Sequence, residues 1–245
     1  MKISIISGAS SGIGKEIALK LDMLNLDEMW LIALDNDGLV SLSKKLKTKA
    51  RIFPLNLMDS SSFELIKNEL DESKPEVEYL VCCAGVGYNG NFDKITEKNI
   101  SFMINLNCLA LTLLTKCVDP YIVDKGRIIE IASGSGFAPQ PGFAVYAATK
   151  SYVISFSRAL KRELRHRKIA VTAVCPGPVD TAFFASLEGV KEYKKKFVIT
   201  PEKVAIKAVK SSKKRKALCV PSMSMKLFHL ASKILPTSLL LKFYK

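Results

Sequence analysis

Two hydrophobic patterns alternate along the chain. Short apolar runs rich in β-branched residues predict buried strands, and longer runs with apolar residues three or four apart predict helices. We expect strands over 2–7, 29–35, 51–57, 77–83, 126–133, 169–175 and 217–220. We expect helices over 15–21, 36–47, from 59 onward, 99–118, 146–167 and 201–209.

This alternation of strands and helices is typical of a doubly wound α/β fold, a parallel sheet with helices on both faces. No linker, repeat or low-complexity stretch divides the chain, so residues 1–245 are expected to form a single domain. With 48% hydrophobic residues, the chain can bury one large core. No apolar run approaching the ~18 residues of a membrane span is expected. We expect no signal peptide, because a glycine motif already begins at Ser7.

A formal net charge of +14 raises the question of anionic partners. Basic residues cluster over 44–51, 158–168, 191–196 and 213–216. Solvated helix faces and loops explain such clusters, and attraction to an anionic membrane surface or anionic substrates is the alternative. We expect no nucleic-acid partner, because no recognised nucleic-acid motif accompanies the charge.

Cysteine and histidine usage narrows the chemistry further. The six cysteines lack C-x-x-C spacing and several lie in apolar stretches, which favours reduced core residues in a cytoplasmic protein. The two histidines, His166 and His229, lie in a basic turn and in the C-terminal segment. We therefore expect neither a histidine-ligated metal site nor a serine–histidine triad.

A glycine turn follows the first expected strand. Its sequence, Gly8-Ala-Ser-Ser-Gly12-Ile-Gly14, leads directly into the helix at 15–21. Glycines let the backbone approach a pyrophosphate, whose charge then lies at the helix N-terminus. The second strand ends at Asp35, 21 residues after Gly14, where a ribose-binding carboxylate is expected. Together these features predict a dinucleotide site.

Tyr146 and Lys150 are four residues apart and lie on one helix face. A nearby ammonium favours the phenolate and so lowers the pKa of a tyrosine from its ordinary value near ~10. This makes Tyr146 a candidate proton donor or acceptor, although a surface pair would have the same spacing. Gly8, Asp35, Gly85, Ser133 and Pro176 all lie at or just past the carboxyl ends of expected strands, where ligands of such sheets bind.

Taken together, these motifs resemble the short-chain dehydrogenase/reductase family. The matching features run in order from Ile3 to about Thr181: the three glycines, Ala84-Gly85, Asn105 in Ile-Asn-Leu, Ser133, Tyr146 with Lys150, and 176–181 (Pro-Gly-Pro-Val-Asp-Thr). The resemblance implies a Rossmann-like doubly wound sheet. It also implies oxidoreductase activity that interconverts a carbonyl and an alcohol with a nicotinamide cofactor.

The resemblance also implies roles for single residues. Tyr146 would be the general acid/base, Lys150 would bind the nicotinamide ribose and lower the Tyr146 pKa, and Ser133 would bind the substrate oxygen. Asn105 would hold a local break in its helix and a water for proton relay. Two alternatives stay open: Ser135 is a rival to Ser133, and Asn105 can be a packing amide.

The cofactor contacts carry over in the same way. They comprise Gly8, Ser10, Ser11, Gly12, Ile13, Gly14, Asp35, Asn56, Leu57, Ala84, Gly85, Tyr146, Lys150, Pro176, Gly177, Val179 and Thr181. The family's Asn-Asn-Ala-Gly is Cys82-Cys83-Ala84-Gly85 here, its usual threonine before the glycine motif is Ser7, and its adenine-binding aspartate is replaced by Asn56. An aspartate near the ribose repels a 2′-phosphate, so Asp35 favours NAD, with NADP as the alternative.

Beyond Thr181 the family gives less guidance. We expect a substrate lid at about 182–200 and an amphipathic, basic segment at about 222–245. This segment could lie on an anionic bilayer, cover the pocket, or pack against a second subunit. These uses of the segment favour an apolar substrate such as a ketoacyl chain or a sterol. We expect the pocket wall to come from residues 136–143 and the lid, which include Phe137, Phe143, Phe183 and Phe184. Relatives commonly form homodimers or homotetramers, so we expect a homodimer or homotetramer of this chain.

Two other functions compete with the oxidoreductase. A catalytically idle relative could bind a dinucleotide as a sensor or interaction protein, but it would not need Ser133, Tyr146 and Lys150. The hypothesis of a membrane- or nucleic-acid-associated protein rests on charge alone. Salt-sensitive binding to anionic vesicles or DNA without turnover would support it.

Overall fold

The computed structural model describes residues 1–187 and 197–242. Its centre is a seven-stranded sheet in which every pair of neighbouring strands is parallel, in the order β3-β2-β1-β4-β5-β6-β7. The strands are β1 (Lys2–Ser7), β2 (Glu28–Ala33), β3 (Lys49–Pro54), β4 (Glu76–Cys82), β5 (Ile122–Ile131), β6 (Ala170–Val174) and β7 (Leu218–Cys219). The strands β1 to β3 are added toward one edge of the sheet, and from β4 onward they are added toward the other edge. This change of side between β3 and β4 confirms the Rossmann-like doubly wound fold.

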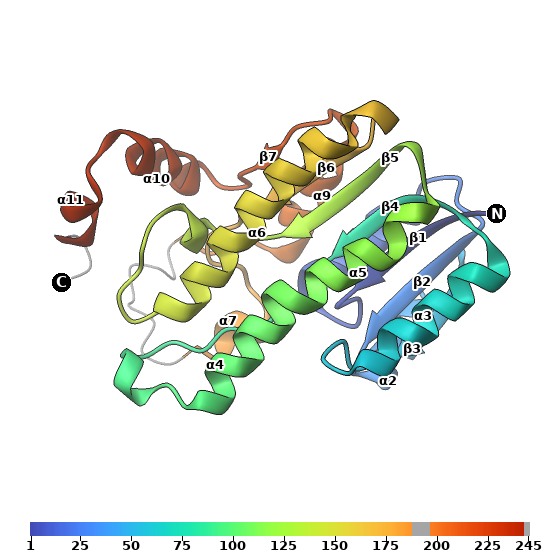
Figure 1. Cartoon of the computed structure of the whole chain (residues 1–245), viewed down its shortest axis with the longest axis horizontal. Coiled ribbons are helices and arrows are strands. Elements are labelled where there is room, and N and C mark those ends of the chain that lie inside the picture. Colours follow the sequence, from blue (N-terminus) through green and yellow to red (C-terminus); the bar gives the residue numbers. More distant parts are fainter. Residues whose placement is uncertain (188–196, 243–245) are drawn as a thin grey trace.

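Helices cover both faces of this sheet (Figure 1). On one face α3 (Ser60–Ser73), α5 (Leu111–Val118) and α6 (Ala144–Glu163) contribute to one apolar cluster. On the other face α1 (Gly12–Leu21), α2 (Asn36–Ser43) and α9 (Pro201–Lys213) contribute to a second. The central strand β1 supplies Ile3 and Ile5 to the first cluster and Ile6 to the second. A strand buried on both faces reads as a continuous apolar run, as expected for a parallel sheet.

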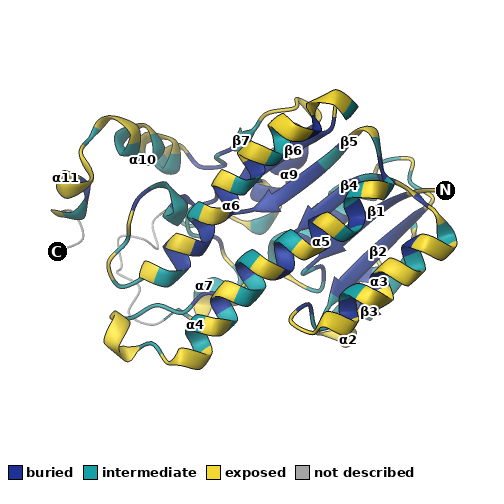
Figure 2. Cartoon of the chain, in the orientation of Figure 1, coloured by how far each residue is buried: buried dark blue, intermediate teal, exposed yellow. Residues whose placement is uncertain are grey.

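The burial pattern follows the same three layers. In Figure 2 the central strands are mostly buried, whereas the helices packed on the sheet have a buried stripe toward it and an exposed stripe outward. Trp30 of β2 is the largest fully buried side chain, and its ring lies 5.1 Å from that of Phe53 on β3. Both apolar clusters lie against the same seven-stranded sheet, so the fold is a single domain.

A long apolar helix lies across one face of the sheet. α4 (Glu97–Ile104), a π-helical turn (Asn105–Ala110) and α5 follow one another directly. Glu97–Tyr121, 25 residues with a mean hydropathy of 1.5 in its most apolar window, is long and apolar enough to cross a membrane. The expectation of no such run was therefore wrong. Because α5 buries Leu111, Leu114 and Val118 against the sheet, the match is weak evidence for a membrane span.

The C-terminal elements lie near the carboxyl ends of the strands. Helix α7 (Ala182–Ala185) begins the expected lid, and residues 188–196 of that lid lie outside the described residues. Helices α10 (Met223–Ile234) and α11 (Thr237–Lys242) form an arm at one end of the molecule (Figure 1). The amphipathic segment expected at 222–245 therefore contains two helices, and residues 243–245 lie outside the described part.

Candidate active site

A cavity of about 970 Å³ opens at the carboxyl ends of the central strands. It is lined by the β1–α1 turn, by residues just past β4, β5 and β6, by α6, and by α7 and α10. Most of the predicted site residues line it: Gly8, Ser10, Ser11, Gly12, Ile13, Ala84, Gly85, Ser133, Tyr146, Lys150, Pro176, Gly177, Val179 and Thr181. Sites of this fold are expected here, outside the carboxyl edge of the sheet.

The glycine turn is packed too closely for side chains. Gly8 has a φ of +65°, and a Cβ added there would lie 2.7 Å from the backbone nitrogen of Ala84. A Cβ on Gly14 would lie 2.1 Å from the Gly8 oxygen, so α1 starts directly against the turn. Ser10 to Ile13 line the cavity at the N-terminus of α1. A helix N-terminus beside a bare turn fits a pyrophosphate, so these residues suit a dinucleotide.

Ser7 explains how the chain manages without the family's paired asparagines. Its hydroxyl accepts hydrogen bonds from the backbone nitrogens of Cys83 (3.1 Å) and Ala84 (3.3 Å). These bonds tie the end of β1 to the chain just past β4. The Cys82-Cys83 substitution therefore leaves the floor of the cavity held by a serine.

Tyr146 lies in the first turn of α6 and is 6% exposed. Its ring stacks on Phe143 at 4.3 Å and contacts Phe183 of α7 at 5.6 Å. Burial raises the pKa of Tyr146 to about 12, and its hydrogen bond with Ser133 acts in the opposite direction. At neutral pH the chain by itself therefore holds Tyr146 as a protonated phenol.

Lys150 lies one turn further along α6 and is 5% exposed. Its ammonium donates to the Ile131 carbonyl at 2.9 Å and lies 5.7 Å from the Tyr146 ring centroid. Burial lowers the pKa of Lys150 to about 8. The expected lowering of the Tyr146 pKa by Lys150 is not found: burial of the phenol sets the shift, and the Lys150 ammonium is directed at a backbone carbonyl.

Ser133 rather than Ser135 pairs with Tyr146. Ser133 lies just past β5, its hydroxyl accepts from the Ser135 backbone nitrogen at 3.1 Å, and it acts to lower the pKa of Tyr146. Ser135 lines the same cavity, and no such effect on Tyr146 comes from it among the described contacts. The geometry therefore favours Ser133 as the substrate-facing serine.

Asn105 does not lie where it was expected. Its amide donates to the Ser101 hydroxyl at 3.1 Å on the outer side of the helix. Asn107 is fully buried instead: its Oδ1 accepts from Val86 N (2.9 Å), and its Nδ2 donates to Val86 O (2.8 Å) and Thr149 Oγ1 (3.1 Å). Asn107 and Lys150 both lie against Gly85.

The expected break in the helix is present, as the π-helical turn Asn105–Ala110, but it directs Asn107 and not Asn105 toward the site. The sequence held a usable signal. Asn107 continues the buried stripe of Met103, Ala110, Leu111 and Leu114 at helical spacing, and Asn105 does not.

We expect Asn107→Ala to lower kcat/KM roughly tenfold to a hundredfold, because it leaves the Val86 backbone groups without partners beside Lys150. Asn105→Ala, the matched control two residues away, should stay within about twofold of wild type. Steady-state kinetics measure kcat/KM of both variants. Equal losses of kcat/KM would contradict the placement of Asn107, and not Asn105, at the site. A thermal melt of each separates lost activity from lost folding.

Four predicted cofactor contacts do not line the cavity: Gly14, Asp35, Asn56 and Leu57. Asp35 caps α2 through its Oδ1, which accepts from Gly38 N at 2.9 Å. The side chains of Asp35 and Ser10 both lie against Gly38. Asn56 accepts from Met58 N at 3.1 Å, and Leu57 is buried in the apolar core. Asp35 and Asn56 lie past β2 and β3, on the side of the sheet next to the glycine turn.

The structure adds walls that the motifs did not specify. Asn89 to Asn91 line the cavity as a loop, and Met225, Phe228 and Ala231 line it from α10. Gln140 to Phe143 also line it, within the wall expected at 136–143. Met225 packs on Gly134 and Gly177. In the sequence, only the apolar periodicity of residues 222–235 indicated that this segment packs against the cavity.

Comparison with known proteins agrees with this geometry. Residues 2–191 match the family model described as short chain dehydrogenase, so the chain belongs to the short-chain dehydrogenase/reductase family of oxidoreductases. It is 31% identical over 219 residues to an NADP-dependent 3-hydroxy acid dehydrogenase from Schizosaccharomyces pombe, covering 83% of this chain and 84% of the relative.

Two further similarities span most of the chain. The first, at 32% identity over 182 residues and 74% of each chain, is to the 3-oxoacyl-[acyl-carrier-protein] reductase FabG from Escherichia coli. The second is a solved short-chain dehydrogenase from Sphingobium yanoikuyae in complex with NADPH. It superposes with a TM-score of 0.81 at 26% identity, covering 95% of this chain and 93% of that one.

Proposed function

We propose that this protein interconverts a carbonyl and an alcohol with NAD or NADP, using Tyr146 as the general acid/base. The observation that carries the proposal is the placement of Ser133, Tyr146 and Lys150 together in the wall of a cavity whose other end is a glycine turn. The family membership and the dinucleotides named for its relatives support the cofactor class.

The residues act in order along the cavity. The Ser133 hydroxyl binds the substrate oxygen and orients it toward the Tyr146 phenol. Tyr146 then donates its proton to that oxygen in reduction, or accepts one from the alcohol in the reverse direction. When bound, the nicotinamide supplies or accepts the hydride. The Lys150 ammonium, buried one helical turn away, stabilises negative charge on the phenol oxygen as it develops.

Proton relay falls to the groups behind Lys150. Its ammonium is held by the Ile131 carbonyl and lies against Gly85 beside Asn107. With a pKa of about 8, Lys150 can lose and regain a proton near neutral pH, so it suits a relay to solvent. We assign Asn107 the role of holding this relay in place.

We infer an apolar substrate from the lining of the cavity. Phe143, Phe183, Phe184, Phe197 and Phe228 line it, together with aliphatic residues of α10 and α11. Aromatic and aliphatic walls around a few polar groups favour a ligand with an apolar body and one reacting oxygen. A ketoacyl chain or a sterol has this shape.

Separate titrations with NADH and NADPH, followed by nicotinamide fluorescence, test the proposal directly. We expect at least one dinucleotide to bind saturably and to be oxidised in the presence of a panel of apolar ketones. Binding without turnover across the panel would favour the alternative, an idle dinucleotide sensor. Failure of both to bind would overturn the cofactor assignment.

We propose NAD as the preferred cofactor because Asp35 lies next to Ser10 of the glycine turn. The variant Asp35→Asn removes the charge but keeps a good helix cap on α2. We expect it to tighten NADPH binding about tenfold, with NADH changed less than threefold, because repulsion of a 2′-phosphate is lost. Kd values for both dinucleotides give the ratio, and an unchanged ratio would place the 2′ position away from Asp35.

We propose that the chain forms a homodimer or homotetramer through the outer face of α4, α5 and α6. Ile104, Leu109, Leu113 and Tyr152 are each more than 40% exposed on these helices. An apolar surface on adjacent helices suits a second copy of the same chain. The six cysteines are free thiols, which supports a cytoplasmic location.

We propose further that α10 makes a peripheral contact with anionic membranes. Met223, Leu227, Leu230 and Ile234 lie along one face of α10 and are 55–70% exposed, with Lys226 and Lys233 beside them. An apolar stripe flanked by lysines suits an anionic lipid surface. The opposite face of α10 lines the cavity, so an apolar substrate could reach it from lipid.

Two variants, each with exposed aliphatic side chains replaced by serine, separate the proposed membrane contact of α10 from the proposed subunit interface. The triple variant Leu227→Ser, Leu230→Ser, Ile234→Ser should reduce co-sedimentation with phosphatidylglycerol-containing vesicles at least tenfold and leave the oligomer intact. The variant Leu109→Ser, Leu113→Ser should weaken the oligomer and keep vesicle binding. Sedimentation velocity measures the oligomer. Loss of assembly in the α10 variant would mean that a second copy occupies that face.

A further inference from the structure

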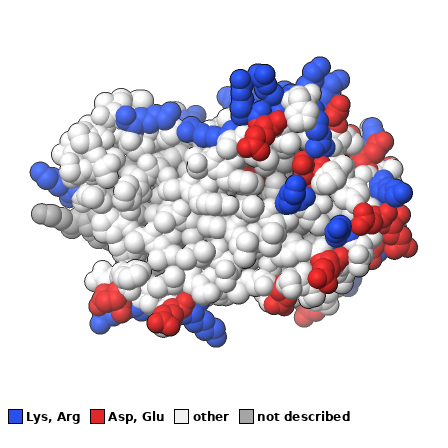
Figure 3. Space-filling model, viewed as in Figure 1, with Lys and Arg blue, Asp and Glu red and all other residues white. Residues whose placement is uncertain are grey.

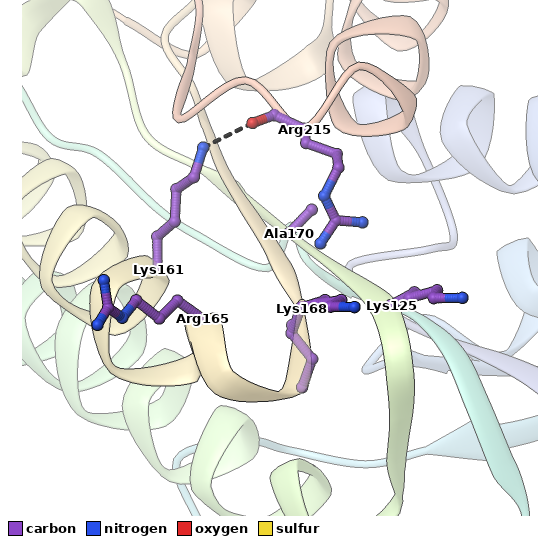
Figure 4. Close-up of a pocket in the computed structure, with 7 residues that line it drawn as sticks. Lys125, Lys161, Arg165, Lys168, Ala170 and Arg215 are labelled. Carbon is purple, nitrogen blue, oxygen red and sulfur yellow. Dashed lines mark hydrogen bonds between the residues drawn. The ribbon is translucent and has the colours of Figure 1, made fainter.

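A second hollow, of about 440 Å³, lies at the opposite edge of the sheet from the candidate active site. It is lined by the side chains of five cationic residues around a small apolar floor of Ile169 and Ala170. The cationic residues are Lys125, Lys161, Arg165, Lys168 and Arg215. They come from the start of β5, the end of α6, the turn before β6 and the segment after α9 (Figure 4).

Its charge is not balanced within the described part of the chain. Among residues 1–187 and 197–242, none of the five forms an ion pair, and no carboxylate lines the hollow. Figure 3 shows lysine and arginine side chains concentrated at the edge of the molecule over the end of α6. The pKa of Lys161 is lowered by its burial and by the charge of Arg215. The cationic groups therefore destabilise one another.

Helix dipoles account for only part of this arrangement. Cations are favoured at the C-terminal ends of α6 and α9, which explains Lys161 and Arg215 individually. Lys125 lies at neither helix end, because it belongs to the irregular start of β5, where the pairing with β4 shifts register. A dipole effect also gives no reason for these segments to surround one hollow.

The backbone at three of the positions adds to the argument. Lys125, Lys168 and Arg215 have φ values of +66°, +53° and +56°, and only one other non-glycine residue in the described chain, Lys74, has a positive φ. Glycine or asparagine adopts this conformation more readily. At each position the chain carries a cation despite that strain. Three of the four positive-φ non-glycine residues in the described chain therefore place their charges around this one hollow.

The side chains are also partly organised. The Lys161 ammonium donates to the Arg215 backbone carbonyl at 2.6 Å, which fixes the segment after α9 against α6. In Figure 4 the Arg215 guanidinium points toward Ala170 and Lys168, and Arg165 points away from them. A guanidinium and two ammonium groups on Lys125 and Lys168 can together contact a phosphate group from several sides.

We propose that this hollow binds a small multivalent oxyanion of the phosphate class, such as a phosphorylated metabolite or pyrophosphate, at a site separate from the dinucleotide. Its volume lies within the range of small-molecule sites, and its concave apolar floor suits a compact ligand. The proposal does not depend on the activity assigned to the cavity at the other edge of the sheet.

Calorimetric titration with pyrophosphate tests the proposal, on protein already saturated with whichever dinucleotide it binds so that the glycine turn is occupied. The variant Lys125→Gln, Lys168→Gln, Arg215→Gln removes three charges from the hollow. The matched control Lys44→Gln, Lys45→Gln, Lys98→Gln removes three charges from exposed lysines elsewhere. We expect the hollow variant to weaken pyrophosphate binding at least tenfold and the control less than twofold, at a constant salt concentration.

Other outcomes would overturn the proposal. Equal losses in both variants would mean that net charge alone attracts the anion, and the absence of saturable binding in wild type would exclude the site. Binding of a polyglutamate peptide but not of pyrophosphate would make the hollow a docking patch for an acidic protein. Dinucleotide titration of the hollow variant should match wild type, so failure of this site and failure of the proposed enzyme activity are distinguishable.

Discussion

We expect Tyr146→Phe to lower kcat about a thousandfold while leaving the Kd for the preferred dinucleotide within about threefold, in line with the usual contribution of a general acid/base. The substitution removes only the hydroxyl. The ring contacts with Phe143 and Phe183 remain, so the cavity keeps its shape. Initial rates with the best apolar ketone, together with fluorescence titration, measure the two quantities separately.

Tyr152→Phe is the matched control for this experiment. Tyr152 lies on the same helix but is 42% exposed, and its hydroxyl shares a hydrogen bond with Thr112 at 2.9 Å, outside the cavity. We expect its turnover to stay within twofold of wild type. Turnover by Tyr146→Phe at the level of this control would remove Tyr146 from the mechanism, whatever the dinucleotide titration shows.

The strands were predictable because burial on both faces leaves a continuous apolar run. The first strand was placed correctly at Lys2–Ser7, and the second, third and fourth each began and ended one to three residues earlier than expected. Each of these strands is followed by an apolar residue (Leu34, Leu55 and Cys83), so the pattern does not mark where hydrogen bonding to the next strand stops. The element order and the parallel sheet were nevertheless confirmed.

Site residues were predictable where the backbone itself forms the site. The glycine turn and the residues after β6 could be placed at the cavity from strand ends alone. The choice between Asn105 and Asn107 depends on the rotational phase of a helix that contains a π-helical turn, and such a turn shifts the phase of the residues that follow. The apolar spacing from Met103 to Leu114 favours Asn107, but the Ile-Asn-Leu motif directed the prediction to Asn105.

The pKa of Tyr146 shows a different limit. Spacing to Lys150 suggested a lowered value, but neighbours from distant segments decide the outcome. Phe183 lies 37 positions further along the sequence, and with Phe143 it encloses the phenol ring. Desolvation by such contacts depends on the tertiary fold, so it could not be read from the Tyr146–Lys150 pair.

A buried carboxyl outside the cavity leads to the second large effect. Glu130 on β5 is fully buried between α5 and α6, where its carboxylate accepts hydrogen bonds from Thr115 and Ser157. No lysine or arginine pairs with it among the described residues. Burial raises the pKa of Glu130 to about 7, and the two hydroxyls only partly oppose that rise.

The sign of the stability effect follows from proton binding. The unfolded chain releases this proton near pH ~4.3, whereas the folded protein retains it to about pH 7, so folding is favoured at low pH and weakened as pH rises between these values. At ~1.4 kcal/mol per pKa unit, the loss between pH 5 and pH 8 reaches roughly 3 kcal/mol. Glu130→Gln should therefore be more stable than wild type at pH 8 by about that amount, relative to the difference at pH 5.

Urea denaturation of both proteins at pH 5 and pH 8 measures this change. Comparing the two pH values cancels any packing change that the amide introduces, because that change is common to both. Glu28→Gln is the control: Glu28 is also buried in the sheet, but its carboxylate pairs with Lys49 at 3.2 Å. The control should be destabilised at both pH values, since it loses an ion pair. If Glu130→Gln gained no stability from pH 5 to pH 8 relative to wild type, the Glu130 carboxyl would already be ionised at pH 5 in the folded protein, and its hydroxyl partners would outweigh its burial.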